Sequence, residues 1–270
     1  MMLPNYLLKN VNRIKNLPTQ KLGSWSSAYD GIIFDEFPVM QRLREKFPQK
    51  TIHRADVISL FGSGDLYLAF VAAMVWGGIS ASRPNIKSDK KTTNLYLALS
   101  HPEEKVIKAI KHAENCFLQN DFITPFKDMT RKGEHYIPCI GLSYFTKIFF
   151  FIGQSNPNII VKPLVFDKWT SNAFYALLSE TYPEDRTKYF TGINLKPEIE
   201  KLGTVALRSG SKLCVAYERY CALMNSWSIA PEISVTPDRL EQFVFGSSLK
   251  SRGQRNNPRI ELWEIITSNQ

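Results

Sequence analysis

Residues 135–153 read HYIPCIGLSYFTKIFFFIG, in which a compact turn pattern with one proline is followed by a strongly aromatic run. Wound as a helix at about 100° per residue, the run is apolar nearly all round, which predicts a largely buried helix. Lys147 is the one charged residue inside that run. A buried amine is costly unless it is paired or has a function, so Lys147 is the first candidate for a functional residue.

Three roles are open for Lys147. Burial disfavours the charged form of an amine, which would make Lys147 a usable nucleophile near neutral pH. It could instead form a structural ion pair with Asp167. It could also bury only its aliphatic stem and extend its amine to the surface.

The composition is that of a globular protein, with 44% hydrophobic and 22% charged residues among 270. Lys and Arg total 34 against 25 Asp and Glu, and the net charge of +9 favours a polyanionic partner. The four cysteines form no CxxC pair, and the four histidines show no ligand spacing. We therefore expect neither a metal nor another cofactor.

Sparse cysteines fit a reducing compartment, and residues 1–18 lack the apolar core and cleavage site of a secretion signal. The longest apolar run, residues 66–76, is too short to span a bilayer and reads as a buried helix. We expect a soluble, cytoplasmic protein that contacts no membrane and has no obligate protein partner.

Helical patterns dominate the chain and strand patterns are few, so the expected fold is mainly α with few or no strands. The extended apolar stretch 159–166 contains Pro163, which argues against a central strand. We expect one helical unit over residues 1–270, with the chemistry in a segment at about 130–180. The predicted helices cover approximately residues 37–47, 66–76, 101–119, 142–153, 168–180, 212–232 and 236–246.

The segment 137–141, IPCIG, is similar to the turn of a helix-hairpin-helix, whose usual pattern is apolar–Pro–Gly–apolar–Gly. Such a turn exposes backbone N–H groups beside a helix N-terminus, where a DNA phosphate binds without sequence readout. Cys139 stands where glycine is usual, and cysteine suits a positive φ poorly. The residues expected to contact the DNA backbone are Ile137, Cys139, Ile140, Gly141 and Ser143.

The blocks GLSYFTKIFFFIG (141–153) and PLVFDKWTSNAF (163–174) together resemble a bacterial family related to 8-oxoguanine DNA glycosylases. FVAAMVWGG (70–78) and PDRLEQFVFG (237–246) also look like that family, so the resemblance covers about residues 56–245. It implies a helix-hairpin-helix DNA glycosylase fold, double-stranded DNA as partner, and excision of a flipped-out modified base that leaves an abasic site.

The same resemblance gives Asp167 a catalytic role, in which its carboxylate stabilises positive charge on the deoxyribose and orients a water. The structural alternative is that Asp167 only caps the helix that follows it, and both can hold at once. In related glycosylases with a catalytic lysine, that lysine stands two positions after the second glycine of the hairpin. This position is Ser143 here, and Lys147 lies one turn further on about the same face. Attack by Lys147 would add lyase activity, whereas attack by water would leave a plain abasic site.

A flipped-out base needs aromatic or apolar groups to hold it, and the residues expected in such a pocket are Trp76, Trp169 and Tyr144. Core packing is the alternative for each of them. Phosphate contacts are expected from basic residues beside the site or in loops, for which a solvated surface is the alternative. These basic residues are Arg83, Lys87, Lys168 and Arg252.

The base itself is not written in these motifs, and two substrate classes stay open. The branch resembles antiphage glycosylases that remove hypermodified bases such as glucosylated hydroxymethylcytosine, and Lys147 without a lysine at position 143 slightly favours this class. The other class is oxidised guanine in DNA repair. A non-catalytic DNA-binding module and a helical scaffold with a coincidental IPCIG are the remaining alternatives.

Overall fold

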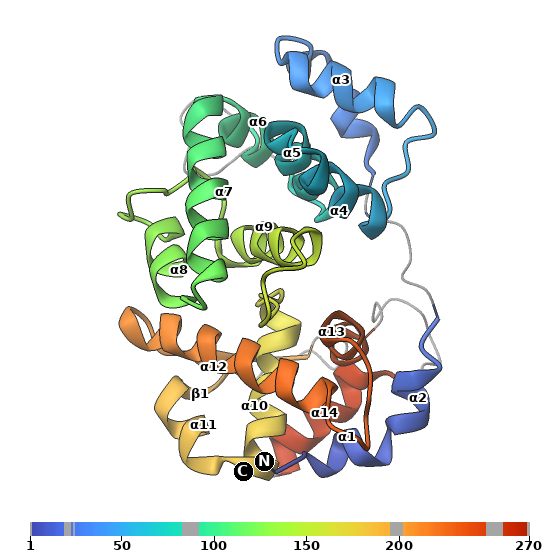
Figure 1. Ribbon diagram of the computed structural model, residues 1–270, viewed down its shortest axis with the longest axis vertical. Coiled ribbons are helices and arrows are strands. Elements are labelled where there is room, and N and C mark those ends of the chain that lie inside the picture. The colour runs from blue at the N-terminus through green and yellow to red at the C-terminus, as the bar shows by residue number, and fades with distance from the viewer. Residues whose placement is uncertain are drawn as a thin grey trace. The chain divides into compact units, whose positions relative to one another are not determined.

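The computed structural model describes residues 2–18, 23, 25–82, 92–194, 202–246 and 256–268, and it is built almost wholly of helices (Figure 1). Over these residues the chain forms fourteen α-helices, two short 3₁₀ helices and one two-stranded sheet. The mainly helical fold predicted from the sequence is confirmed.

The chain divides into two compact units. Thr19–Pro163 is called the hairpin unit here, and Met1–Pro18 together with Leu164–Gln270 is called the aspartate unit. The boundary between them falls inside the segment at about 130–180 where the chemistry is expected. A single unit over residues 1–270 stays a prediction, and each unit is described by itself.

The hairpin unit contains seven α-helices and two 3₁₀ helices in its described residues. They are η1 (Ser27–Asp30), η2 (Ile32–Phe34), α3 (Pro38–Lys46), α4 (Arg54–Ser63), α5 (Leu66–Trp76), α6 (Asn94–Leu99), α7 (Glu103–Leu118), α8 (Ile123–Met129) and α9 (Leu142–Ser155).

Helix α9 packs against α4, α5 and α7 and forms the centre of the hairpin unit. Its aromatic run is buried as the sequence predicted. Phe149 meets Phe117 of α7 edge to face with ring centroids 5.0 Å apart, and Phe151 stacks on Phe61 of α4 at 6.0 Å. Each fully buried side chain of this size stabilises the fold by about 1.5–3 kcal/mol, so the run fixes α9 firmly among its neighbours.

Helix α5 begins and ends where the sequence pattern indicates. An Oδ1 atom of Asp65 accepts the N–H of Leu68 at 3.3 Å, which caps the first turn, and the helix stops at Gly77. All residues between Tyr67 and Val75 are buried, as expected for a helix that is apolar on every side.

In its described residues, the aspartate unit contains seven α-helices and the small sheet. They are α1 (Asn5–Lys9), α2 (Val11–Lys15), α10 (Lys168–Thr181), α11 (Pro183–Tyr189), β1 (Phe190–Asn194), β2 (Thr204–Leu207), α12 (Ser211–Ser228), α13 (Pro237–Phe245) and α14 (Pro258–Ser268).

Helix α10 forms the centre of the aspartate unit and packs against α11, α13, α14 and β2. Its buried ring Phe174 lies 5.4 Å from Tyr220 of α12, and Phe166 lies 5.0 Å from the same tyrosine. These rings join the start of α10 to α12, so the backbone around residue 167 is held by packing on both sides.

Strands β1 and β2 pair antiparallel in a region that the sequence pattern indicated to be loop-rich. Asn172 of α10 holds the start of β2, because its amide donates to the carbonyl of Gly203 at 3.2 Å and accepts the N–H of Val205 at 2.9 Å. Most of β1 is exposed on both faces, so its sequence lacks the alternation that marks a half-buried strand.

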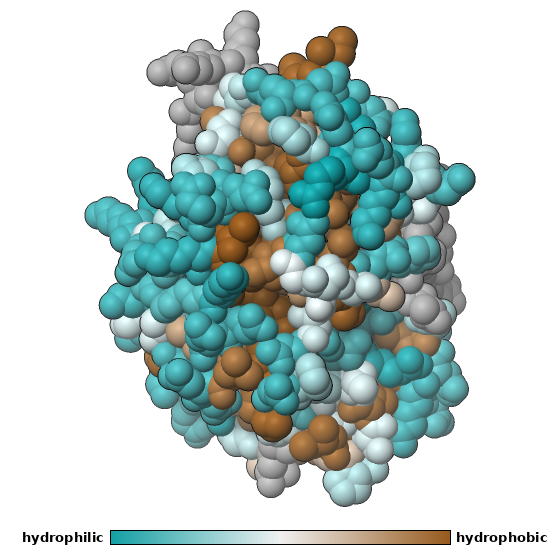
Figure 2. Space-filling model, turned by 45° about the horizontal axis from the view of Figure 1, so that its top comes forward, coloured by the Kyte–Doolittle hydropathy of each residue, from teal (hydrophilic) through white to brown (hydrophobic). Residues whose placement is uncertain are grey.

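None of the helices in the described ranges is long and apolar enough to cross a bilayer. On the face drawn in Figure 2, hydrophilic residues cover most of the surface and hydrophobic ones lie in patches among them. The most exposed large hydrophobic residues are Ile32, Ile160 and Ile229.

Candidate active site and DNA-binding hairpin

The segment IPCIG forms the tight turn that its pattern predicts. The N–H of Ile140 donates to the carbonyl of Ile137 at 3.2 Å and closes a four-residue turn around Pro138 and Cys139. Cys139 has φ 63°, in the left-handed region. Proline followed by a residue of positive φ is the arrangement of a type II turn. Cysteine in place of the usual glycine therefore changes the residue and leaves the turn intact.

Two side chains of the turn are buried in the core, whereas the end of the turn is exposed to solvent. The side chains of Ile137 and Ile140 are only 1–2% exposed, whereas Gly141 is exposed. Because the two isoleucine side chains are buried, a contact between this turn and DNA would come from the backbone. The N–H of Ile140 is already used inside the turn, which directs attention to the N–H groups that follow it.

Gly141 is the N-cap of helix α9, and no side chain caps this helix. In the described part of the chain, the backbone N–H groups of Gly141, Leu142 and Ser143 donate to no acceptor. Such groups point out of a helix N-terminus, where the helix dipole also favours negative charge. The start of α9 therefore has the properties of an anion site.

Lys147 is buried, 9% exposed, but its amine does not end among the aromatic rings. Its Nζ donates to the carbonyl oxygen and to the Oγ of Ser143, each at 2.8 Å, and lies 5.2 Å from the centre of the Tyr144 ring. The amine thus turns back one helical turn toward the start of α9. It reaches Ser143, which stands two positions after Gly141.

The C-terminal end of α5 lies against the side chain of Lys147. A Cβ at Gly77 would lie 2.8 Å from Cδ of Lys147, so only a glycine lets the lysine stem pass this closely. The hydroxyl of Tyr144 donates to the carbonyl of Gly78 at 3.3 Å. The structure therefore brings Ser143, Tyr144 and Lys147 together beside the C-terminal end of α5.

Trp76, the last residue of α5, is half-buried and mostly part of the core. Its ring meets Phe151 edge to face at 5.1 Å, the guanidinium of Arg54 lies 5.7 Å from it, and Gly23 packs directly on it. Within the described ranges its indole N–H is buried and has no hydrogen-bond partner. Core packing therefore explains most of the contacts of Trp76. Its place in a base pocket stays a prediction.

Asp167 is the N-cap of α10, half-buried in the aspartate unit. Its Oδ1 accepts the N–H of Trp169 at 2.8 Å and that of Thr170 at 3.1 Å, while its own N–H donates to Oγ1 of Thr170 at 2.8 Å. This reciprocal capping box fixes the carboxylate in one orientation. All of these bonds to backbone N–H groups use Oδ1.

Arg259 of α14 lies near this carboxylate, and no sequence pattern pointed to it. Its guanidinium carbon is 4.4 Å from the Trp169 ring and 4.4 Å from the Phe245 ring, and its Nε donates to the carbonyl of Phe245 at 2.5 Å. Burial lowers the pKa of Arg259 to about 10, and the charge of Asp167 acts in the opposite direction. The ring of Trp169, a predicted base-pocket residue, therefore faces the guanidinium group of Arg259.

Of the predicted phosphate contacts, Lys168 is the one that lies among the described residues. Its Nζ donates to the carbonyl of Leu202 at 2.8 Å and lies 4.4 Å from the Trp169 ring, so its ammonium bonds within its own unit. Arg83, Lys87 and Arg252 lie outside the described residues.

The predicted site residues thus fall into two groups. The hairpin, Ser143, Tyr144 and Lys147 belong to the hairpin unit, and Asp167, Lys168 and Trp169 belong to the aspartate unit. A single pocket that contains both Lys147 and Asp167 stays a prediction.

The fold is that of a mainly helical protein in which a tight turn leads into the start of α9. A family model described as "Putative 8-oxoguanine DNA glycosylase OGG-like protein" matches residues 22–245, which is more than half of the 270 residues. The chain belongs to this OGG-like family. The family indicates a DNA glycosylase and, with it, a protein that binds DNA. No curated protein and no solved structure matches the chain significantly.

Proposed function

We propose that this protein is an enzyme that flips a modified base out of double-stranded DNA and cuts its N-glycosidic bond. In this proposal the base leaves with the electrons of the bond, and positive charge develops on the deoxyribose. The carboxylate of Asp167 stabilises that charge and orients the water that attacks the sugar. The product is an abasic site.

The observation that carries the proposal is the fixed carboxylate at the start of α10. Oδ1 of Asp167 is held by two backbone N–H groups, so the carboxyl group does not need to be ordered during the reaction. The open N-terminus of α9 supports DNA as the substrate, because its N–H groups suit a backbone phosphate.

For Lys147 we propose a positioning role rather than attack on the sugar. Its Nζ makes two hydrogen bonds to Ser143, and its stem is confined by Gly77. A nucleophile would have to leave this arrangement to reach a sugar carbon. The held amine instead supports binding of the DNA near the hairpin, where its charge would add to that of the helix N-terminus.

Two substrates are candidates, and one observation favours each of them. The family description favours 8-oxoguanine. The serine at position 143, with its lysine partner one turn later, favours a hypermodified base such as glucosylated hydroxymethylcytosine in phage DNA, and hence a role in antiphage defence. The two bases differ greatly in size, so one enzyme should discriminate strongly between them.

The test is an excision assay with duplexes that carry 8-oxoguanine, uracil, an alkylated base or glucosylated hydroxymethylcytosine, followed by alkali. We expect alkali-dependent cleavage with one of the two carried substrates and none without alkali. Absence of cleavage with every duplex and with glucosylated phage DNA would overturn the glycosylase assignment.

Borohydride trapping tests the role of Lys147. We expect no covalent adduct with DNA during excision, because a water rather than an amine attacks the sugar. The matched control is Lys162→Ala, because Lys162 is another partly buried lysine of the hairpin unit, and burial lowers its pKa. An adduct that disappears in Lys147→Ala and persists in Lys162→Ala would make Lys147 the nucleophile.

A further inference from the structure

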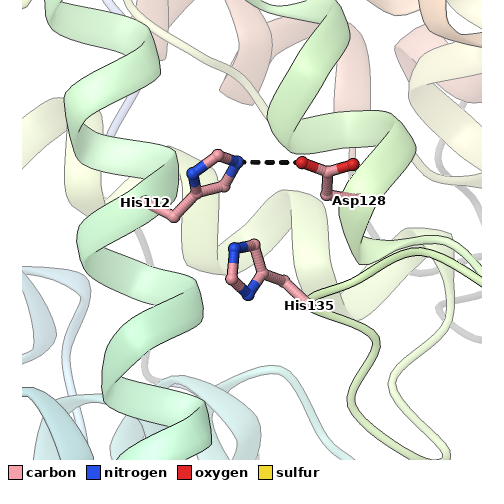
Figure 3. Close-up of side chains that lie close together, drawn as sticks. All are labelled: His112, Asp128 and His135. Carbon is pink, nitrogen blue, oxygen red and sulfur yellow. Dashed lines mark hydrogen bonds and ion pairs between the residues drawn. The ribbon is translucent and has the colours of Figure 1, made fainter.

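Two histidines and an aspartate from three separate segments meet in the hairpin unit (Figure 3). His112 lies in the middle of α7, Asp128 lies near the end of α8, and His135 lies in the loop between α8 and the hairpin turn. They are 16 and 7 residues apart along the chain, which is no recognised ligand spacing. None of them belongs to the two groups of site residues described above.

The ligand atoms of these three residues are close enough to share one ion. Nε2 of His112 lies 2.9 Å from Oδ2 of Asp128, and one ligand atom from each of the three residues lies within 4.8 Å of the other two. In Figure 3 a ring nitrogen of His135 faces the other two side chains. Ligands of a tetrahedral zinc ion lie about 3.3 Å from one another, since each stands about 2.0–2.2 Å from the metal. A small movement of the His135 ring would complete such a geometry.

The surroundings of these three side chains favour a bound cation over an anion or a purely structural contact. The rings of His112 and His135 lie 4.4 Å apart, so one nitrogen lone pair from each imidazole could reach the same ion. The carboxylate of Glu134 lies 4.0 Å from Nε2 of His135 and is itself bonded to Lys108 at 3.0 Å.

The donor types select the metal. Two imidazoles and one carboxylate suit zinc, whereas magnesium and calcium need oxygen donors almost alone. A sulfur donor is also near, because Sγ of Cys116 lies 3.8 Å from Nε2 of His112. His135 additionally lines an open cavity of about 410 Å³.

We propose that His112, Asp128 and His135 bind a zinc ion that ties the loop before the hairpin turn to α7 and α8. His135 is two residues ahead of Ile137, the first residue of the turn. A metal here would cross-link the loop to α7 and α8. The loop already meets α8 through the hydrogen bond from His135 N–H to the carbonyl of Asp128 at 3.0 Å, and α7 through the ion pair of Glu134 with Lys108 at 3.0 Å. The site would therefore stabilise the base of the DNA-binding hairpin.

The test uses the full chain, stripped with a chelator and titrated with zinc, while bound metal is measured by mass spectrometry after dialysis. We expect about one equivalent of zinc per chain and a rise in the melting temperature on zinc addition. Cobalt(II) in place of zinc should give the intense visible absorption of a tetrahedral site.

Asp128→Asn is the principal variant, because an amide oxygen can still accept a hydrogen bond from His112 and the fold should survive. It should weaken zinc binding at least tenfold, and the double variant His112→Ala/His135→Ala should abolish it. The matched control is His101→Ala, a histidine of the same cavity wall that is not part of the cluster. The proposal fails if the stripped wild-type chain binds no more zinc or cobalt than the double variant. It also fails if His101→Ala reduces binding as much as Asp128→Asn does.

Discussion

Helices α9 and α10 each form the centre of one unit, and they begin in opposite ways. The N-cap of α10 is Asp167, whose carboxylate accepts the N–H groups of Trp169 and Thr170. The N-cap of α9 is Gly141, which has no side chain to offer, and the first N–H groups of α9 find no acceptor in the described residues. Any helix leaves such donors at its start, and the two helices deal with them differently.

We propose a separate task for each helix start. In α10 the donors are occupied within the chain, and the result is a carboxylate held in one orientation. In α9 the donors stay open, and the result is a place for an anion that the protein does not itself supply. A DNA glycosylase needs both devices, one to stabilise a sugar cation and one to hold the phosphate backbone.

Removing the charge at the closed start should have the largest effect. Asparagine caps a helix as well as aspartate does, so Asp167→Asn should leave the free energy of unfolding nearly unchanged. It takes away the negative charge that the proposed mechanism needs, and the single-turnover excision rate should fall by a factor on the order of 100 or more. Excision of the preferred base under enzyme excess measures the rate, and urea unfolding measures stability.

Asp65→Asn is the matched control for this variant. Asp65 is also an aspartate N-cap, at the start of α5, and accepts the N–H of Leu68. It should leave the excision rate unchanged. If Asp167→Asn excised the base at the wild-type rate, Asp167 would have only a capping role. The proposed catalytic role of the start of α10 would then be wrong.

Closing the open start should have the second largest effect. Gly141 has φ −83° and ψ −179°, and a Cβ there would meet nothing within 4 Å, so Gly141→Asp should fit without strain. The new carboxylate would cap α9 much as Asp167 caps α10, which should raise the free energy of unfolding by a few tenths of a kcal/mol. It would also occupy the donors proposed for phosphate and should weaken DNA binding about tenfold.

Gly141→Ala separates these two consequences, because alanine neither caps the helix nor carries charge. It should bind DNA nearly as the wild type does. Fluorescence anisotropy at several salt concentrations measures both variants, and the salt dependence should be shallower for Gly141→Asp. Equal affinity for Gly141→Asp and the wild type would exclude the start of α9 from the DNA interface.

The contrast between α9 and α10 also shows what the sequence could predict. The two helices, the turn before α9 and the cap at Asp167 all follow from residues within one or two turns of each other, so their patterns are local. The positive φ of Cys139 was foreseeable for the same reason, because the hairpin pattern has glycine at that position.

What could not be predicted depends on contacts between distant residues. Arg259 is 90 residues from Trp169 in the chain, and the packing of α14 on α10 brings the two together. His112, Asp128 and His135 come from three segments with no common spacing. Two asparagines and a proline at residues 256–258 mark the helix start of α14, but no pattern in this stretch indicates a contact between Arg259 and Trp169.

The smallest expected effect concerns the backbone that leads into each helix. Asp167 is extended, with φ −119°, whereas the turn before α9 holds Cys139 at φ 63°. A left-handed conformation costs a non-glycine residue on the order of 1 kcal/mol, and glycine loses about 0.5 kcal/mol more backbone entropy on folding. Cys139→Gly should therefore raise the free energy of unfolding by about 0.5 kcal/mol in urea titrations, whereas Cys139→Ala should not raise it. A lower free energy of unfolding for Cys139→Gly would mean that the cysteine side chain stabilises the turn through its own contacts. The open start of α9 would then depend on the Cys139 side chain rather than on the backbone of the turn.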